Sequence, residues 1–233
     1  MSNYNNIVKE LARLGNPTRA AHSQRFFKTG PGEYGEGDVF LGIQMPVQRI
    51  IAQKFIELNL KDVQKLIDSK IHEHRMTGLL IITYKYKKAD KAEKGKLFKF
   101  YIKNSKKINN WDLVDVTCHI VVGDYLRDKP RDLLYRWSKS SNLWEKRLSI
   151  ISTYAFIRHN DLNDMYKISN TLLNDNHNLI HKAVGWMLRE AGKRDKQRLV
   201  KYLESNAHKM PRTMLRYAIE KFTESERKYY LNK

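Results

Sequence analysis

The apolar residues are spaced as in helices along almost the whole chain, and few residues interrupt that spacing. Only five prolines and eleven glycines occur in 233 residues. Apolar positions recur three and four residues apart, which is the period of an amphipathic helix rather than of a strand. The sequence holds neither an alternation of strands with helices nor an Asn-Gly hairpin signal. We therefore expect an all-α protein.

The predicted helices follow one another in pairs joined by short polar links. They span residues 5–14, 17–28, 46–58, 61–69, 72–87, 90–105, 110–127, 130–139, 142–159, 161–173, 177–194, 195–207, 211–222 and 224–231. From residue 46 onward a pair takes up roughly 35 to 45 residues, close to the period of HEAT-like repeats. Such pairs stack into a curved solenoid with a concave side. We expect a single HEAT-like repeat domain over residues 1–233, and a compact helical bundle without a groove is the alternative.

The chain is strongly basic. Its 44 Lys and Arg residues outnumber 25 Asp and Glu, which gives a formal net charge of +19, and the excess is spread over both halves of the sequence. A long positive surface favours a polyanion, of which nucleic acid is the commonest. We therefore expect the concave groove to be basic. A scaffold for other proteins, the ordinary role of HEAT-like repeats, would need an acidic partner to suit this charge.

Composition also bounds the compartment and the kinds of site. With 41% hydrophobic residues the chain can build a core, which excludes disorder. No run approaches the roughly 18 apolar residues of a membrane span, and the first fifteen residues lack the pattern of a signal peptide. The single cysteine, Cys118, excludes a disulfide framework and a cysteine-based zinc site. We expect a cytoplasmic monomer that does not bind membranes.

Residues 29–38 break the helical pattern. Their four glycines suggest a phosphate-binding loop, but the Gly-Lys-Ser/Thr ending is missing, and Glu33, Glu36 and Asp38 would repel a phosphate. We therefore expect an ordered irregular connection that presents Tyr34 near its tip.

Two histidines have the spacing of metal ligands. His177 and His181 lie four residues apart on one predicted helix, but the glutamate of the HExxH zinc motif is absent between them. We expect these histidines to cap the helix or to lie on its surface, and we expect no metal or organic cofactor.

Residues 108–115, with the sequence INNWDLVD, are the most informative stretch. Their asparagines predict a helix N-cap, and the helix dipole is a sufficient reason for Asp112 in the first turn. Asp115 lies in the second turn, where that benefit has faded. Because Trp111 and Asp115 are four residues apart, they share one helix face. A partly buried tryptophan beside a solvated aspartate is the alternative interpretation.

Two later helices combine basic and aromatic residues. Arg147 lies one turn into its helix, on the polar side, and Lys182, Trp186 and Arg189 follow one another at i, i+4 and i+7. Gly185 lies in mid-helix, where glycine costs about 1 kcal/mol relative to alanine, so another group is expected to approach closely there. A basic–aromatic–basic stripe suits a nucleic-acid backbone. For each cation taken alone, a solvated helix face is the alternative.

Four sequence motifs, in this order, resemble those of the AlkD-like DNA glycosylases. They are residues 40–46 (FLGIQMP), 111–115 (WDLVD), 144–147 (WEKR) and 182–190 (KAVGWMLRE). That family consists of HEAT-like repeat proteins that remove alkylated purines from DNA. The resemblance extends from about Phe26 to about Phe222. Phe26 stands where a tyrosine lies near the DNA in a family member, so no polar role transfers to it.

The resemblance implies a DNA glycosylase of base excision repair. Its substrates would be cationic alkylated purines, 3-methyladenine and 7-methylguanine, in duplex DNA, and it would need no cofactor. Asp115 resembles the catalytic carboxylate, and Trp111 and Trp186 resemble the aromatic pair around the deoxyribose of the lesion. Arg147 resembles the cation at the lesion-site backbone, and we expect Lys182 and Arg189 to extend the DNA contact. A non-catalytic nucleic-acid-binding solenoid of the same family is the alternative.

Overall fold

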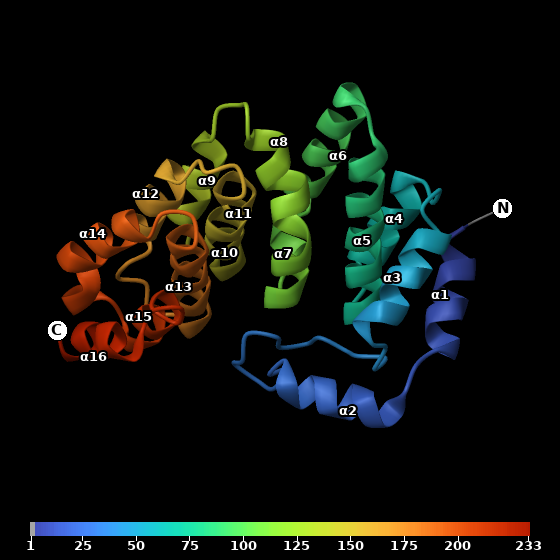
Figure 1. Cartoon of the computed structure of the whole chain (residues 1–233). Helices are drawn as coiled ribbons and strands as arrows, with labels where there is room; N and C mark the ends of the chain where they lie inside the picture. Colours follow the sequence, from blue (N-terminus) through green and yellow to red (C-terminus); the bar gives the residue numbers. More distant parts are fainter. Residues whose placement is uncertain (1–2) are drawn as a thin grey trace. The chain divides into compact units, whose positions relative to one another are not determined.

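The computed structural model describes residues 3–233 and is all-α, as the apolar spacing predicts (Figure 1). The only β pairing among these residues is an isolated parallel bridge between Val39 and Ile71. The chain divides into two compact units, one up to Thr117 and one from Cys118 onward. A single repeat domain over residues 1–233 stays a prediction.

The first unit is built around one buried helix. Its elements are α1 (Tyr4–Arg13), α2 (Pro17–Phe26), α3 (Met45–Lys54), α4 (Leu60–Ile67), α5 (His72–Lys88), α6 (Lys91–Lys103), a 3₁₀ turn (Ser105–Lys107) and the start of α7 (Trp111–Cys118). Helices α3, α4 and α6 pack against α5. Every residue of α5 from 72 to 83 is buried. Polar side chains at the start of α5 are therefore buried as well and need partners inside the protein.

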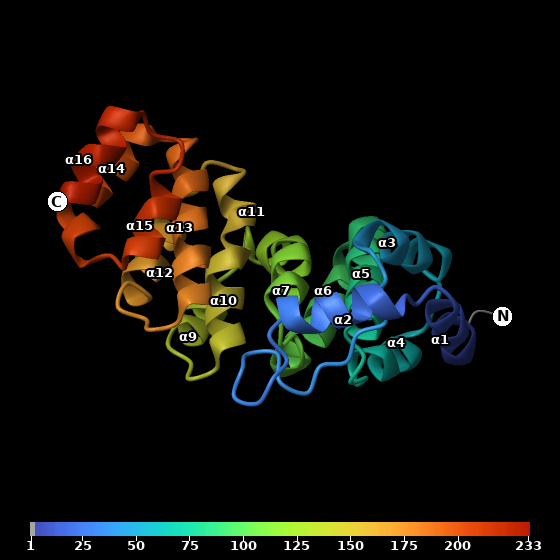
Figure 2. The ribbon, with the colours of Figure 1, turned by 90° about the horizontal axis from the view of Figure 1, so that it is seen from below.

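Helix α2 is an exception, because none of its residues is buried. It crosses the ends of α5 and α7, as the two views show (Figures 1 and 2). Its start is fixed to the chain before α3, where the Asn16 N–H donates to the carbonyl of Leu41 at 2.7 Å. Gly42 has a positive φ of 78°, and a Cβ there would lie 2.3 Å from the Asn16 carbonyl oxygen. Only glycine fits this close approach.

The second unit continues the chain as helices packed in sequence order. After a π-helical turn (His119–Gly123) come α8 (Asp124–Leu126), α9 (Asp132–Ser138), α10 (Leu143–Ser152), α11 (Tyr154–Ile157), α12 (Asn163–Thr171), α13 (Asn178–Gly192), α14 (Lys196–Asn206), a 3₁₀ turn (Ala207–Lys209), α15 (Arg212–Ala218) and α16 (Glu224–Asn232). Helix α10 packs against α9 and α13, and α13 packs against α12, α14 and α15 (Figure 2). Packing of each helix on helices close to it in the chain is the arrangement of a helical repeat.

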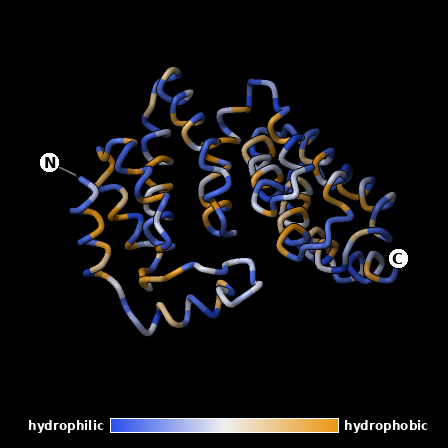
Figure 3. The backbone as a smooth tube through the Cα atoms, turned by 180° about the vertical axis from the view of Figure 1, so that it is seen from behind, coloured by the Kyte–Doolittle hydropathy of each residue, from blue (hydrophilic) through white to orange (hydrophobic). Residues whose placement is uncertain are grey.

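Polar links between the helices act as caps. A side-chain oxygen accepts a hydrogen bond from a backbone N–H of the first turn at Asn3, Asn16, Asn59, Asp90, Asn142, Asp195 and Thr223. These caps begin helices where the sequence predicts links. Along the helices, hydrophobic residues are interspersed with hydrophilic ones (Figure 3). Among the described residues, no helix has the length and apolar character of a membrane span.

Helices α13 and α15 approach closely at Gly185. A Cβ at this position would lie 2.4 Å from the Met214 carbonyl oxygen and 2.5 Å from the Tyr217 Cβ. The close approach that a mid-helix glycine predicts is therefore that of α15, a neighbour within the same unit.

Candidate functional site

Trp111 opens α7 and is held by side chains from two directions. The Asn110 side-chain oxygen accepts a hydrogen bond from the Trp111 N–H at 2.8 Å. The indole stacks on Phe27 with ring centroids 5.4 Å apart and meets the edge of Phe26 at 6.1 Å. Phe26 itself is 57% exposed. The half-buried Trp111 ring therefore lies against the end of α2.

Asp115 lies one helical turn after Trp111 and is half-buried. The tryptophan and the carboxylate are therefore on the same helix at the predicted spacing, within the first unit.

Asp112 corrects the sequence-based interpretation. The helix dipole was a sufficient reason for a first-turn aspartate, yet this residue is only 8% exposed. Its Oδ2 accepts a hydrogen bond from His72 Nε2 at 2.8 Å, and its Oδ1 accepts one from the Leu113 N–H at 2.8 Å. The carboxylate thus ties α7 to α5, a role that the sequence does not reveal.

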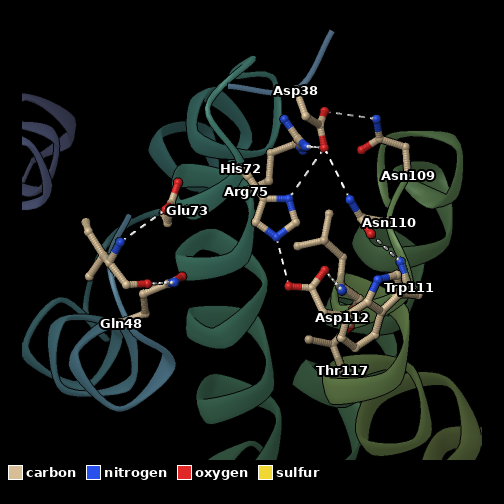
Figure 4. Close-up of polar contacts among 12 residues, drawn as sticks. Asp38, Gln48, His72, Glu73, Arg75, Asn109, Asn110, Trp111, Asp112 and Thr117 are labelled. Atoms are coloured by element: carbon tan, nitrogen blue, oxygen red, sulfur yellow. Dashed lines mark hydrogen bonds and ion pairs between the residues drawn. The ribbon is translucent and has the colours of Figure 1, made fainter. Parts of the chain in front are cut away.

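His72, the first residue of α5, lies between two carboxylates and is 2% exposed (Figure 4). Its Nε2 faces Asp112, and its Nδ1 lies 3.5 Å from Asp38 Oδ2. Burial alone would lower the pKa of His72. The charges and hydrogen bonds of Asp112 and Asp38 outweigh both burial and the nearby Arg75, and they raise the pKa of His72 to about 9. His72 is therefore an imidazolium at neutral pH.

Asp38 and Arg75 complete a buried quartet with His72 and Asp112. Arg75 Nη2 lies 2.7 Å from Asp38 Oδ2, and both side chains are buried. Burial would raise the pKa of Asp38, but the hydrogen bond from His72 and the charge of Arg75 hold it below its usual value. The quartet joins two cations and two anions, so its net charge is zero.

The rings around His72 link the quartet to the tryptophan. Phe40 stacks on His72 with centroids 4.6 Å apart, and Phe27 lies 5.1 Å from His72. Phe27 therefore contacts both the imidazolium and Trp111. A cation against aromatic faces is a favourable contact in a buried site.

The glycine-rich segment is an ordered irregular connection, as predicted. Glu33 and Glu36 accept hydrogen bonds from the N–H groups of Gly30 and Gly32, each at 2.9 Å. Asp38 turns inward into the quartet. The first two acids thus shape the loop, and the third anchors it.

Glu73 anchors the rest of that connection. Its carboxylate accepts hydrogen bonds from the N–H groups of Leu41 at 2.9 Å, Gly42 at 2.7 Å and Ile43 at 3.2 Å (Figure 4). These residues belong to the motif at 40–46, so the motif has a structural explanation: a buried carboxylate on α5 binds it.

In the second unit, Trp186 lies on α13 beside Tyr154, a ring that the sequence did not single out as a site residue. Its indole is 6.1 Å from Tyr154, which is 5.5 Å from His119. The half-buried Trp186 is thus the end of a row of three aromatic rings. Helical spacing singles out neither Tyr154 nor His119, because contacts between helices leave no spacing signal.

Arg147 is buried, with 5% of its surface exposed. Its Nη1 donates a hydrogen bond to the carbonyl of Leu179, so the side chain connects α10 to the start of α13. A solvated helix face therefore does not describe Arg147. Its contact with a DNA backbone stays a prediction.

The two other predicted cations lie on α13 and are half-buried. Arg189 forms ion pairs with Glu190 at 3.2 Å and with Glu220. Lys182 precedes it by two turns, with Trp186 between them. The predicted stripe thus lies on one helix, and the ion pairs of Arg189 neutralise part of its positive charge.

The paired histidines bond to backbone groups at the start of α13. His177 Nδ1 accepts a hydrogen bond from the Leu179 N–H at 3.1 Å and caps α13, as predicted. His181 Nε2 pairs with the carbonyl of Asp175. No cluster of three or more metal-ligating side chains occurs within residues 3–233.

Comparisons with known proteins address the whole chain. A family model described as "DNA alkylation repair enzyme" matches residues 7–222, which span both units. A solved structure, a predicted DNA alkylation repair enzyme from Enterococcus faecalis, superposes with a TM-score of 0.69 over 90% of this chain and 97% of its own. At 14% identity that likeness establishes the fold alone. No curated protein matches. The match over residues 7–222 shows that the chain belongs to the DNA alkylation repair enzyme family.

Proposed function

We propose that this protein is a DNA N-glycosylase that removes cationic alkylated purines, 3-methyladenine and 7-methylguanine, from duplex DNA in base excision repair. The observation that carries the proposal is the pairing of Trp111 with Asp115, both half-buried and one turn apart on α7, in a chain of the DNA alkylation repair family. Binding to DNA alone does not need a carboxylate at this position.

The chemistry suits a single carboxylate. A purine alkylated at N3 or N7 is already cationic, so it leaves as a neutral base and needs no strong acid. Glycoside hydrolases, whose leaving groups are poorer, generally use two carboxyl groups. As the glycosidic bond breaks, positive charge builds on the deoxyribose. Asp115 would stabilise that charge and orient the attacking water.

Aromatic faces would add to this stabilisation. Trp111 is held by Phe26 and Phe27, and Trp186 is held by Tyr154, so neither indole has to be ordered when substrate arrives. A ring face beside a developing cation contributes cation–π attraction. We propose that these two tryptophans enclose the sugar of the lesion.

The charge of the chain supports duplex DNA as the partner. A net charge of +19 provides the counterion release that drives binding to phosphates. We propose that Lys182 and Arg189 contact the DNA backbone and that Arg147 acts at the lesion site. The protein would work as a cytoplasmic monomer, and its DNA would lie in a shallow basic groove rather than in a deep base-flipping pocket.

The test is incubation of the purified protein with methylated duplex DNA, followed by chromatographic identification of the released bases. We expect free 3-methyladenine or 7-methylguanine. Asp115→Asn should lower the excision rate by ~10² or more, the usual effect of losing a main electrostatic stabiliser, while duplex affinity is retained. Trp111→Ala and Trp186→Ala should cost less, because each removes part of the enclosure.

The control must be a first-turn aspartate without a buried partner. Asp112 is unsuitable because it pairs with His72. Asp132 is the matched choice, since it lies in the first turn of α9 and is exposed. Asp132→Asn should change stability by about 0.5 kcal/mol and leave excision unaltered. Full activity of Asp115→Asn would show that the carboxylate role is wrong. A wild-type protein that binds duplex DNA but releases no base would favour the non-catalytic alternative.

A further inference from the structure

We propose that His72 is a positioning residue for base excision: through its hydrogen bond to Asp112 it fixes the first turn of α7, and with it Trp111 and Asp115. This inference rests on the proposed function of that site. It assigns a role to a buried histidine that touches no substrate.

The contacts of the quartet place His72 between the elements that must be aligned. Asp38 comes from the connection before α3, His72 and Arg75 from α5, and Asp112 from α7. The 2.8 Å hydrogen bond between His72 and Asp112 is the link from α5 to α7 within this quartet. Asp112 is the neighbour of Trp111 and precedes Asp115 by three residues. A shift of Asp112 therefore moves both proposed catalytic side chains.

A second route connects the same histidine to the tryptophan. Phe27 contacts His72 at 5.1 Å and stacks on Trp111 at 5.4 Å with an interplanar angle of 20°. His72 thus acts on the helix backbone through Asp112 and on the indole ring through Phe27. Both contacts lie inside the first unit.

The charge of His72 explains why the arrangement holds. A neutral imidazole has one N–H donor, so it can donate to Asp112 or to Asp38 but not to both. The charged groups that face His72 are Asp38, Asp112 and Arg75, while Glu73 is directed to the N–H groups of residues 41–43 (Figure 4). Loss of the proton would leave a buried net negative charge on these three groups. The imidazolium satisfies both carboxylates at once.

The decisive experiment is a double-mutant cycle on single-turnover excision from 7-methylguanine duplex DNA, with duplex affinity measured in parallel. His72→Gln and Asp112→Asn should each lower the rate about tenfold or more and leave affinity nearly unchanged. The double variant should be no slower than the slower single variant, because both act through one contact. Additive losses in the double variant would overturn the proposal.

A matched control lies two residues further on the same helix. His74 is also buried, and its Nδ1 bonds to the Ser69 hydroxyl at 3.1 Å. His74→Gln should also lower thermal stability and should leave the excision rate intact. If His74→Gln slows excision as much as His72→Gln does, His72 is merely structural and the proposal is wrong.

A measurement on the unaltered protein keeps the test independent of folding and of activity. The indole N–H resonance of Trp111, assigned with Trp111→Phe, and the ring resonances of His72 are followed by NMR from pH 7 to about 10. We expect Trp111 to shift with the same midpoint as His72. If the Trp111 resonance does not shift as His72 titrates, the positioning role is overturned. A coupled titration without any base release would contradict the proposed function alone.

Discussion

Asp112 and Asp115 are the same residue type, three positions apart on one helix, yet they face different surroundings. Asp112 is buried against His72, forty positions earlier in the sequence, whereas Asp115 is half-buried. Helical spacing identifies neighbours on one helix. It gives no sign of a partner on another helix. The sequence therefore predicted that both aspartates lie on one helix, but it predicted the surroundings of neither side chain.

Arg147 shows the same limit for cations. The motif at 144–147 singles it out, but the polar side of the helix is where α13 packs, and the guanidinium bonds to the Leu179 carbonyl. Removal of a buried cation with a defined partner costs more stability than removal of a solvated lysine.

Alanine substitutions at Arg147 and Lys182 separate DNA contact from packing. Arg147→Ala should destabilise the protein by about 2 kcal/mol, because a charged hydrogen bond is lost, and Lys182→Ala by less than about 0.5 kcal/mol. Each should lower the salt slope of duplex binding by about one. Urea unfolding and affinity at several salt concentrations measure both effects. If Arg147→Ala leaves the salt slope of duplex binding unchanged, Arg147 has only the structural role of connecting α10 to α13.

At the scale of elements, the sequence predicted helices and their links well. Capping residues and apolar periods are local, and the N-caps Asn59, Asp90, Asn142 and Asp195 lie at or just before predicted helix starts. The π-helical turn at His119–Gly123 was not predicted. A single π turn keeps the chain helical, so the helical spacing over 110–127 gives no sign of it.

The connection between α2 and α3 depends on one carboxylate. Glu73→Gln should destabilise the protein by about 2 kcal/mol, because three backbone N–H groups lose a charged acceptor. Glu36→Gln is the control, since its carboxylate binds the N–H of Gly32 in an exposed part of the loop. Urea unfolding compares the two variants, and equal stabilities would contradict the anchoring role of Glu73.

Packing of α13 on α15 predicts the effect of enlarging Gly185. Helix propensity alone would make Gly185→Ala stabilising by about 1 kcal/mol. The added Cβ would collide with the Met214 carbonyl, however, so we expect a net destabilisation of about 1–3 kcal/mol. Thermal unfolding decides the sign, and a more stable variant would show that the two helices can separate at little cost.

At the scale of the whole molecule, the helical class and the basic charge followed from composition and period, which are sums over many residues. The division near Thr117 and Cys118 was not predicted, because it falls within a continuous helical pattern. A boundary of this kind changes tertiary contacts without altering local sequence, so composition gives no sign of it.

Stability should depend on pH in a way that the quartet sets. The pKa of His72 rises from 6.5 to about 9 on folding, so its contribution of about 3 kcal/mol is complete below pH 6.5 and is lost as pH rises through 9. The depressed pKa of Asp38 acts in the opposite sense, and its contribution is lost as the solution is made acidic. Denaturant unfolding between pH 5 and about 10 measures the profile. His72→Gln should flatten the alkaline fall, and an unaltered fall would contradict this assignment.

The quartet also bears on how such a chain can diverge. Two buried cations balance two buried anions, so replacing any one of them leaves an unpaired charge in the protein interior, which typically costs about 3–5 kcal/mol. Most proteins have little more stability than that to lose. Descendants of this sequence are therefore expected to keep all four residues or to exchange them in compensating pairs. Joint replacement of His72 with Asp112, or of Asp38 with Arg75, leaves the interior neutral and the other ion pair in place.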